Sequence, residues 1–280
     1  MHEWALVLFT LLMQTAIGMV VAAWFYQQFA CSDLRKEEVT AVLRPTLMTA
    51  FVVGILGGLA SVPHLGNPLH AFYTIMHAQS PWMSREILFT GLFIGLLLLT
   101  VLLLVVKRHF SFILLTLTAI AGLVDIYTMS SIYYHSQWTM WNTYGTYAAF
   151  YGSALLVGGL LSATLMLMKL NGLGAMTKTL VGSLFSFATL GVILGVIGSV
   201  VMLSHLGEPL FQGLIEKAQP DGILTYVAIR YVLIALGMIA IGSALAKDQG
   251  RASASTLLFA FVVIAIAEVI GRYIFFILGG

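Results

Sequence analysis

ILFTGLFIGLLLLTVLLLVV, running from Ile87 to Val106, is an apolar stretch without a single charged residue. An α-helix needs roughly 20 apolar residues to cross about 30 Å of hydrocarbon, whereas a transmembrane β-strand needs only about 9–11. Similar runs recur along the 280 residues, of which 60% are hydrophobic and 9% are charged. We therefore predict an all-α integral membrane protein rather than a soluble domain or a transmembrane barrel.

The composition also excludes several classes of function. The formal net charge is only +2 and no basic stripe with interleaved aromatic residues occurs, so we expect no nucleic-acid partner. Cys31 is the one cysteine, which excludes an internal disulfide, a cysteine-ligated iron–sulfur cluster and a c-type haem signature. No predicted helix carries an interior histidine, so we expect no b-type haem, and we predict no metal site in this protein.

Eight apolar stretches predict eight transmembrane helices, because charges, glycine and proline separate them. We place these helices at about 5–26, 45–64, 85–106, 112–134, 145–168, 179–204, 224–245 and 254–277.

A duplicated motif relates the two halves of the sequence. VPHLGNPL at residues 62–69 and LSHLGEPL at residues 203–210 follow the second and the sixth predicted helix. Each half thus has four helices, and because four is even, both halves have the same orientation in the membrane. We predict one membrane domain made of two parallel four-helix repeats, the first at 1–140 and the second at 141–280.

The basic residues indicate the orientation. Most of them lie in or beside the connections after helices one, three, five and seven: Arg35, Lys36, Arg44, Lys107, Arg108, Lys169, Lys178, Lys247 and Arg251. The positive-inside rule places these connections in the cytoplasm and both termini outside, with the two histidine motifs. The outer connection after helix four is rich in aromatic residues, which we expect to form an interfacial belt: Tyr133, Tyr134, Trp138, Trp141, Tyr144 and Tyr147.

His64 and Glu86 are the strongest candidates for chemistry. Pro63 must end or bend the second helix, which places the His64 imidazole at the membrane–water boundary, where it can accept a proton from a lipid-soluble substrate. Glu86 opens the third helix beside Arg85, so it can converge with His64 on one pocket. The alternatives are that His64 only satisfies the broken helix end, that Glu86 only complements the helix dipole, and that Arg85 only contacts lipid headgroups.

Three charges lie deeper, about fourteen or more residues into helices four and eight: Asp125, Glu268 and Arg272. A charge near the bilayer centre costs roughly 2.5–3.5 kcal/mol, so these side chains should face the bundle interior and be paired. We predict a structural charge network in which Glu268 and Arg272 pair within their helix and Asp125 joins them. A proton path or a substrate contact is the alternative.

His205 repeats His64, but the helix that follows it lacks a carboxylate at the position of Glu86. We therefore interpret His205 mainly as inherited turn architecture. His135 lies in an outer connection, where we expect it to be solvated or to face a partner.

Several short motifs together support a family resemblance. They are HEW at 2–4 with Phe9 and Thr10, HLGNP at 64–68, SRE at 84–86, WNT at 141–143 and EVIGR at 268–272. With these motifs the sequence resembles, from its first helix to its last, the membrane anchor subunit of bacterial dimethyl sulfoxide reductase. More distantly, it is similar to the eight-helix quinol-interacting subunits of polysulfide and nitrite reductase systems.

The resemblance implies an anchor without haem in the bacterial inner membrane. This anchor would hold a molybdopterin catalytic subunit and a four-cluster iron–sulfur subunit, bind menaquinol as its substrate and pass electrons to the iron–sulfur subunit in anaerobic respiration. It also implies that His64 and Glu86 are the quinol-site residues. The surrounding pocket would include Gly66, Pro68, Arg85 and His70.

Two positions depart from the family pattern. His70 stands where relatives often have arginine, and Ser131 stands where we expect the arginine of an Arg-x-Tyr motif. A secondary transporter is the alternative of another class, because parallel repeats and buried charges suit it too. The polar motifs lie near one membrane surface rather than at the midplane, which favours the anchor.

Overall fold

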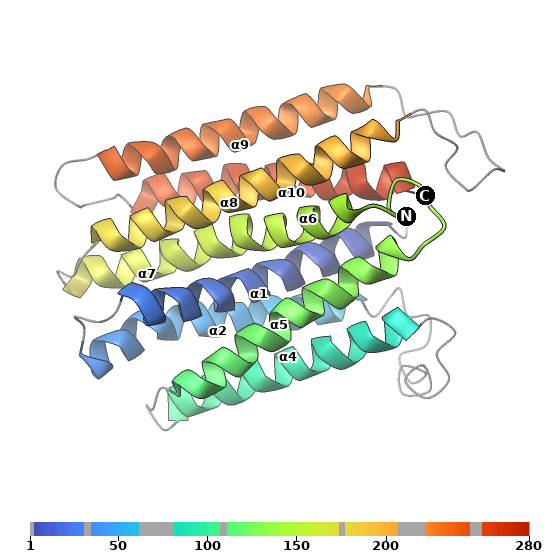
Figure 1. The fold of residues 1–280 in the computed structure, drawn as a ribbon. Helices are drawn as coiled ribbons and strands as arrows, with labels where there is room; N and C mark the ends of the chain where they lie inside the picture. Colours follow the sequence, from blue (N-terminus) through green and yellow to red (C-terminus); the bar gives the residue numbers. More distant parts are fainter. Residues whose placement is uncertain are drawn as a thin grey trace.

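The computed structural model describes residues 3–30, 35–61, 81–106, 111–173, 177–206, 222–246 and 254–279. Within these ranges the protein is helical, and eight spans are long and apolar enough to cross a membrane. Their helices are α1 (Glu3–Ala30), α2 (Lys36–Ser61), α4 (Pro81–Val106), α5 (Phe112–Tyr134), α6 (Tyr144–Ser153) with η3 (Ala154–Gly158) and α7 (Gly159–Leu173), α8 (Thr177–Ser204), α9 (Ile223–Ala246) and α10 (Ala254–Gly279) (Figure 1). The prediction of eight transmembrane helices is confirmed.

The start of α2 differs most from its predicted boundary. This helix begins at Lys36, well before the apolar stretch, and Pro45 lies inside it. Glu37 and Glu38 occupy its first turn, where carboxylates complement the positive end of the helix dipole. The helix therefore extends past the apolar segment, and Pro45 does not mark its boundary, contrary to the prediction.

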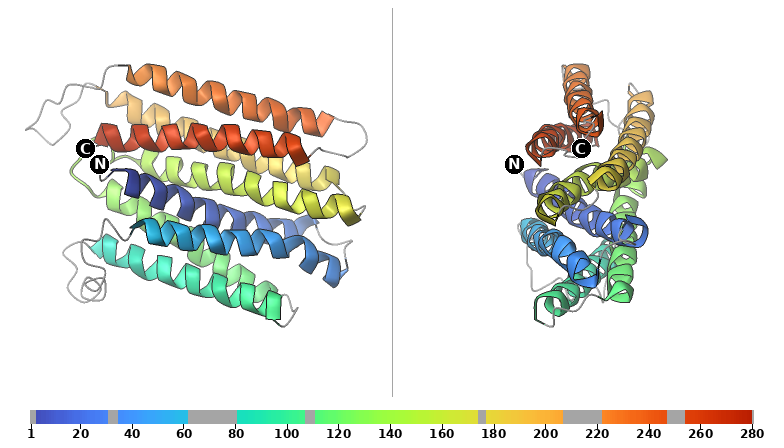
Figure 2. Two further views of the ribbon diagram at one scale, coloured as in Figure 1. Left: turned by 180° about the vertical axis from the view of Figure 1, so that it is seen from behind. Right: turned by 90° about the vertical axis from the view of Figure 1, so that its left-hand side faces the viewer.

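The helices form one elongated bundle whose two most buried spans run through its middle. In α1 and in the fifth span (α6, η3 and α7), 72% of the apolar window is buried, against 22% in α4 and α9. Figure 2 shows α4 and α9 at opposite edges of the bundle, with α1 and the fifth span between them. The exposed aliphatic side chains of the edge helices give the bundle a surface suited to lipid.

The two halves have the same order of neighbours. In the first half α1 packs against α2 and α4 against α5, and in the second half α6 packs against α8 and α9 against α10. The main contact between the halves joins α1 to the fifth span. This packing is compatible with the parallel repeat of 1–140 and 141–280, which stays a prediction.

The central contact depends on two glycines. Gly18 of α1 faces the π-helical turn η3, and a Cβ atom on Gly18 would overlap the carbonyl oxygen of Ala154. A Cβ atom on Gly158 would lie 2.5 Å from the carbonyl oxygen of Thr15. Small residues let two membrane helices approach backbone to backbone, and a π-turn adds a residue without ending the helix.

Gly18→Ala is expected to lower the free energy of unfolding by about 1–3 kcal/mol, because the added methyl group forces two central helices apart. Thermal unfolding of the detergent-purified protein measures this effect. Gly95→Ala is the matched control, since a Cβ atom there meets nothing within 4 Å. The control should leave stability unchanged or raise it by up to about 1 kcal/mol. Equal unfolding temperatures for the two variants would contradict the close approach at Gly18.

Part of the predicted aromatic belt packs inside the bundle instead. Tyr133 is 9% exposed, and its ring centroid lies 5.0 Å from that of Trp141. The indole Nε1 of Trp141 donates a hydrogen bond to the carbonyl oxygen of Phe275 at 2.8 Å. These rings therefore tie the connection after α5 to α10, whereas Tyr144 is 77% exposed and suits the interface.

Candidate functional site

The predicted first-half site is only partly within the described residues. His64, Gly66, Pro68 and His70 lie outside them. Glu86 and Arg85 lie in the first two turns of α4, at the end of the bundle that carries both termini (Figure 1). Because α2 ends at that same end, at Ser61, the sequence that follows it leaves the bundle on the side where Glu86 lies.

Glu86 belongs to a small polar group between α4 and α5. Thr90, one turn after Glu86, donates a hydrogen bond from Oγ1 to Oδ1 of Asp125 at 2.8 Å. Asp125 is fully buried and is close enough to interact electrostatically with Glu86. Its Oδ2 atom has no hydrogen-bond partner within the described residues. Two carboxyl groups near one end of the bundle can accept and release protons there.

Aromatic and basic side chains border this polar group. Trp82 stacks on His135 with a centroid distance of 4.8 Å and an interplanar angle of 24°. The Arg85 guanidinium carbon lies 4.4 Å from the centroid of the Trp82 ring. The sequence pattern favours a solvated connection for His135 and gives no sign of this neighbour. Only a contact between the start of α4 and the end of α5 brings His135 to the site.

Ser131 also has a clear structural role at the position where the family pattern led us to expect arginine. Its hydroxyl lies 2.9 Å from the hydroxyl of Tyr147 and donates to the carbonyl oxygen of Tyr127 at 2.7 Å. Serine therefore joins α5 to α6 through a neutral hydrogen bond.

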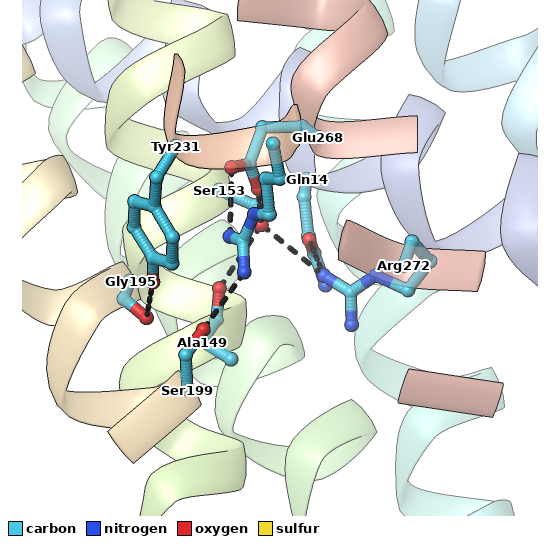
Figure 3. Close-up of polar contacts among 9 residues, drawn as sticks. Gln14, Ala149, Ser153, Gly195, Ser199, Tyr231, Glu268 and Arg272 are labelled. Carbon is cyan, nitrogen blue, oxygen red and sulfur yellow. Dashed lines mark hydrogen bonds and ion pairs between the residues drawn. The ribbon is translucent and has the colours of Figure 1, made fainter. Parts of the chain in front are cut away.

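A second polar cluster lies among α6, α8, α9 and α10 (Figure 3). Arg230 of α9 forms a buried ion pair with Glu268 of α10, with Nη2 and Oε1 2.8 Å apart. Nη1 of Arg230 donates to Ser199 at 2.9 Å, and the Ser153 hydroxyl donates to Oε2 of Glu268. Arg272 donates from Nη2 to Gln14 at 2.6 Å and to Ser153 at 3.4 Å. This cluster joins the second half to α1.

The predicted charge network is therefore wrong in its pairing. Glu268 is paired with Arg230 from another helix, although Arg272 lies at the i+4 position of its own helix. Asp125 is hydrogen-bonded to Thr90 in the first half and belongs to a separate group. From the sequence alone, Arg230 counts among the cations of the outer side. An arginine two turns inside an apolar helix was the available signal that it needed a buried partner.

Tyr133 lies between the two polar groups. It is buried and interacts electrostatically with both Glu86 and Arg272. The two groups are thus distinct in their hydrogen bonds but near enough to influence a common side chain.

In the part of the protein that the structure describes, no three His, Cys, Asp or Glu side chains are placed to hold a metal ion. The acids described above contact hydroxyl groups and arginines rather than one another in a ligand set. The absence of a metal site from the whole protein stays a prediction.

Comparison with known proteins gives consistent matches. A family model described as the DMSO reductase anchor subunit (DmsC) matches residues 1–278. The sequence is 27% identical over 170 residues to one of the chains of anaerobic dimethyl sulfoxide reductase from Haemophilus influenzae, which covers 60% of each protein. It is 27% identical over 168 residues to the anaerobic dimethyl sulfoxide reductase chain YnfH of Escherichia coli, 59% of this protein and 58% of that one. The aligned part spans less than two thirds of either relative.

Proposed function

Because this chain belongs to the DMSO reductase anchor subunit family, we propose that it anchors a molybdoenzyme complex in the bacterial inner membrane and oxidises menaquinol there. The observation that carries the quinol site is the placement of Glu86. This carboxylate lies at the membrane end of α4, next to Asp125, at the end of the bundle where the HLGNP motif follows α2. An acid at that depth can meet both a lipid-soluble quinol and water.

Oxidation of a quinol to a quinone releases two protons and two electrons. In the proposed site His64 accepts the proton of one hydroxyl group, and Glu86 accepts the other or orients the ring. Asp125 and Thr90 position Glu86 from the bundle side. Both protons then pass to the aqueous phase on the side of the two termini, which the basic residues assign to the periplasm.

The electrons leave to a partner, because this protein has too few cysteines to hold an iron–sulfur cluster. The sequence contains one cysteine, whereas such a cluster is held by several. A four-cluster iron–sulfur subunit must then dock on the face that carries the termini, close to the quinol. It would pass the electrons to a molybdopterin catalytic subunit that reduces the terminal acceptor.

Purification of the tagged protein from anaerobically grown cells tests this function. We expect iron–sulfur and molybdenum-containing subunits in the same complex, and we expect a menaquinol analogue to reduce the iron–sulfur clusters, as measured by electron paramagnetic resonance. The same soluble subunits without this anchor are the control and should stay oxidised. Cluster reduction by the quinol analogue in that control, or substrate uptake by vesicles that contain this protein alone, would contradict the proposal and favour the transporter alternative.

A further inference from the structure

A pocket in the second half reaches the Arg230–Glu268 pair. It lies among α6, α8, α9 and α10, with Met202 and Phe275 near the end of the bundle that carries the termini. Its deeper wall includes Ser199, Glu268 and both arginines of the second polar cluster. This pocket is separate from the proposed quinol site, which lies between α2 and α4 in the other half.

The side chains at this pocket carry more positive than negative charge. Arg230 and Arg272 are 7% and 3% exposed, and Glu268 is the carboxylate that interacts with both. Within the described residues the cluster therefore has one guanidinium charge without a matching carboxylate. An unmatched charge inside a membrane bundle is costly, so a counter-charge there would stabilise the fold.

The hydrogen bonds of the cluster show the same imbalance. Both oxygens of Glu268 already accept, one from Arg230 and one from Ser153, and Gln14 and Ser199 accept from the two arginines. In contrast, Nε of Arg230 and both Nε and Nη1 of Arg272 are buried without a hydrogen-bond partner in the described structure. The cluster thus has spare donors and needs an acceptor.

The free space is small. It admits a group of about the size of one or two water molecules, which is too little for a quinone ring. Gly271 helps to define it, because a Cβ atom there would lie 2.5 Å from Nε of Arg230. A water molecule would satisfy some of the donors but would leave the excess charge unmatched.

We propose that this pocket binds a small monovalent anion, of about the size of chloride, beside Arg230 and Arg272. The anion accepts hydrogen bonds from the spare guanidinium groups and balances the excess charge. It enters from the aqueous phase past Met202 and Phe275, and it holds α9 and α10 together. The proposal does not depend on quinol oxidation, because none of its residues belongs to the proposed quinol site.

Thermal unfolding of the purified full-length protein tests this site. Chloride should raise the unfolding temperature saturably relative to gluconate, which is too large for the pocket, at constant ionic strength. At a concentration about five times the dissociation constant we expect a rise of about 2–4 °C. Arg272→Gln should abolish the chloride dependence. Arg35→Gln, which makes the same charge change at a side chain that is 78% exposed, should keep it.

A second measurement covers the case in which Arg272→Gln does not fold. Wild-type crystals grown in bromide should show an anomalous scattering peak at hydrogen-bond distance from Arg230 or Arg272. Equal unfolding temperatures in chloride and gluconate, an undiminished chloride effect in Arg272→Gln, or an ordered water in place of bromide would each overturn the proposal.

Discussion

Glu268→Ala is expected to lower the free energy of unfolding by about 3–5 kcal/mol, the range found when one partner of a buried ion pair is removed. The Glu268 side chain is almost fully buried and accepts hydrogen bonds from Arg230 and Ser153. Its removal leaves the guanidinium groups of Arg230 and Arg272 buried without a carboxylate. The membrane interior offers no water to replace that carboxylate, so the penalty should be near the upper end of the range.

A double variant separates the lost attraction from the uncompensated charge. Arg230→Met combined with Glu268→Met should recover most of the stability, because a buried pair replaced by apolar side chains of similar volume is often neutral. Denaturant titration of the detergent-purified protein measures all variants. Glu38→Ala is the control, since it breaks the exposed Arg35–Glu38 pair and should cost at most about 1 kcal/mol. If Glu268→Ala were no less stable than Glu38→Ala, the buried pair would have no structural importance.

Hydropathy alone predicts the membrane spans well, because lipid requires nearly continuous apolar surface from every helix. It does not predict the π-turn at Ala154–Gly158. That turn lies where the fifth span meets Gly18 of α1, so its cause is a contact between distant segments. Pro45 misleads for a similar reason, because a helix tolerates proline when tertiary packing supports it.

The sequence also predicts which charges need partners, but not which partners they have. Asp125 and Glu268 are buried, as expected for charges deep in membrane helices. Their actual partners, Thr90 and Arg230, come from neighbouring helices. The rotation of each helix about its own axis selects these partners, and a helix that is apolar on all sides gives little sequence signal for that rotation.

Glu86→Gln is expected to slow menaquinol oxidation by the intact complex about 10²–10⁴-fold, the usual contribution of a positioned proton acceptor. Glutamine keeps the size of the side chain and its possible hydrogen bonds to the bundle, but it cannot accept the quinol proton. The complex should therefore assemble normally, with the same iron and molybdenum content. Steady-state oxidation of a menaquinol analogue, followed by reduction of the iron–sulfur clusters, measures the effect.

His64→Ala should give a loss of similar size, because the two residues take protons from the same quinol. His205→Ala is the matched control: it removes the histidine from the second copy of the motif, which lacks a carboxylate equivalent to Glu86. A proton-accepting role further requires that Glu86→Gln lowers kcat and alters the pH–rate profile. A change in KM alone would indicate that Glu86 only shapes the pocket. If Glu86→Gln and His64→Ala both oxidised the quinol as fast as His205→Ala, the quinol site would have to lie elsewhere in the bundle.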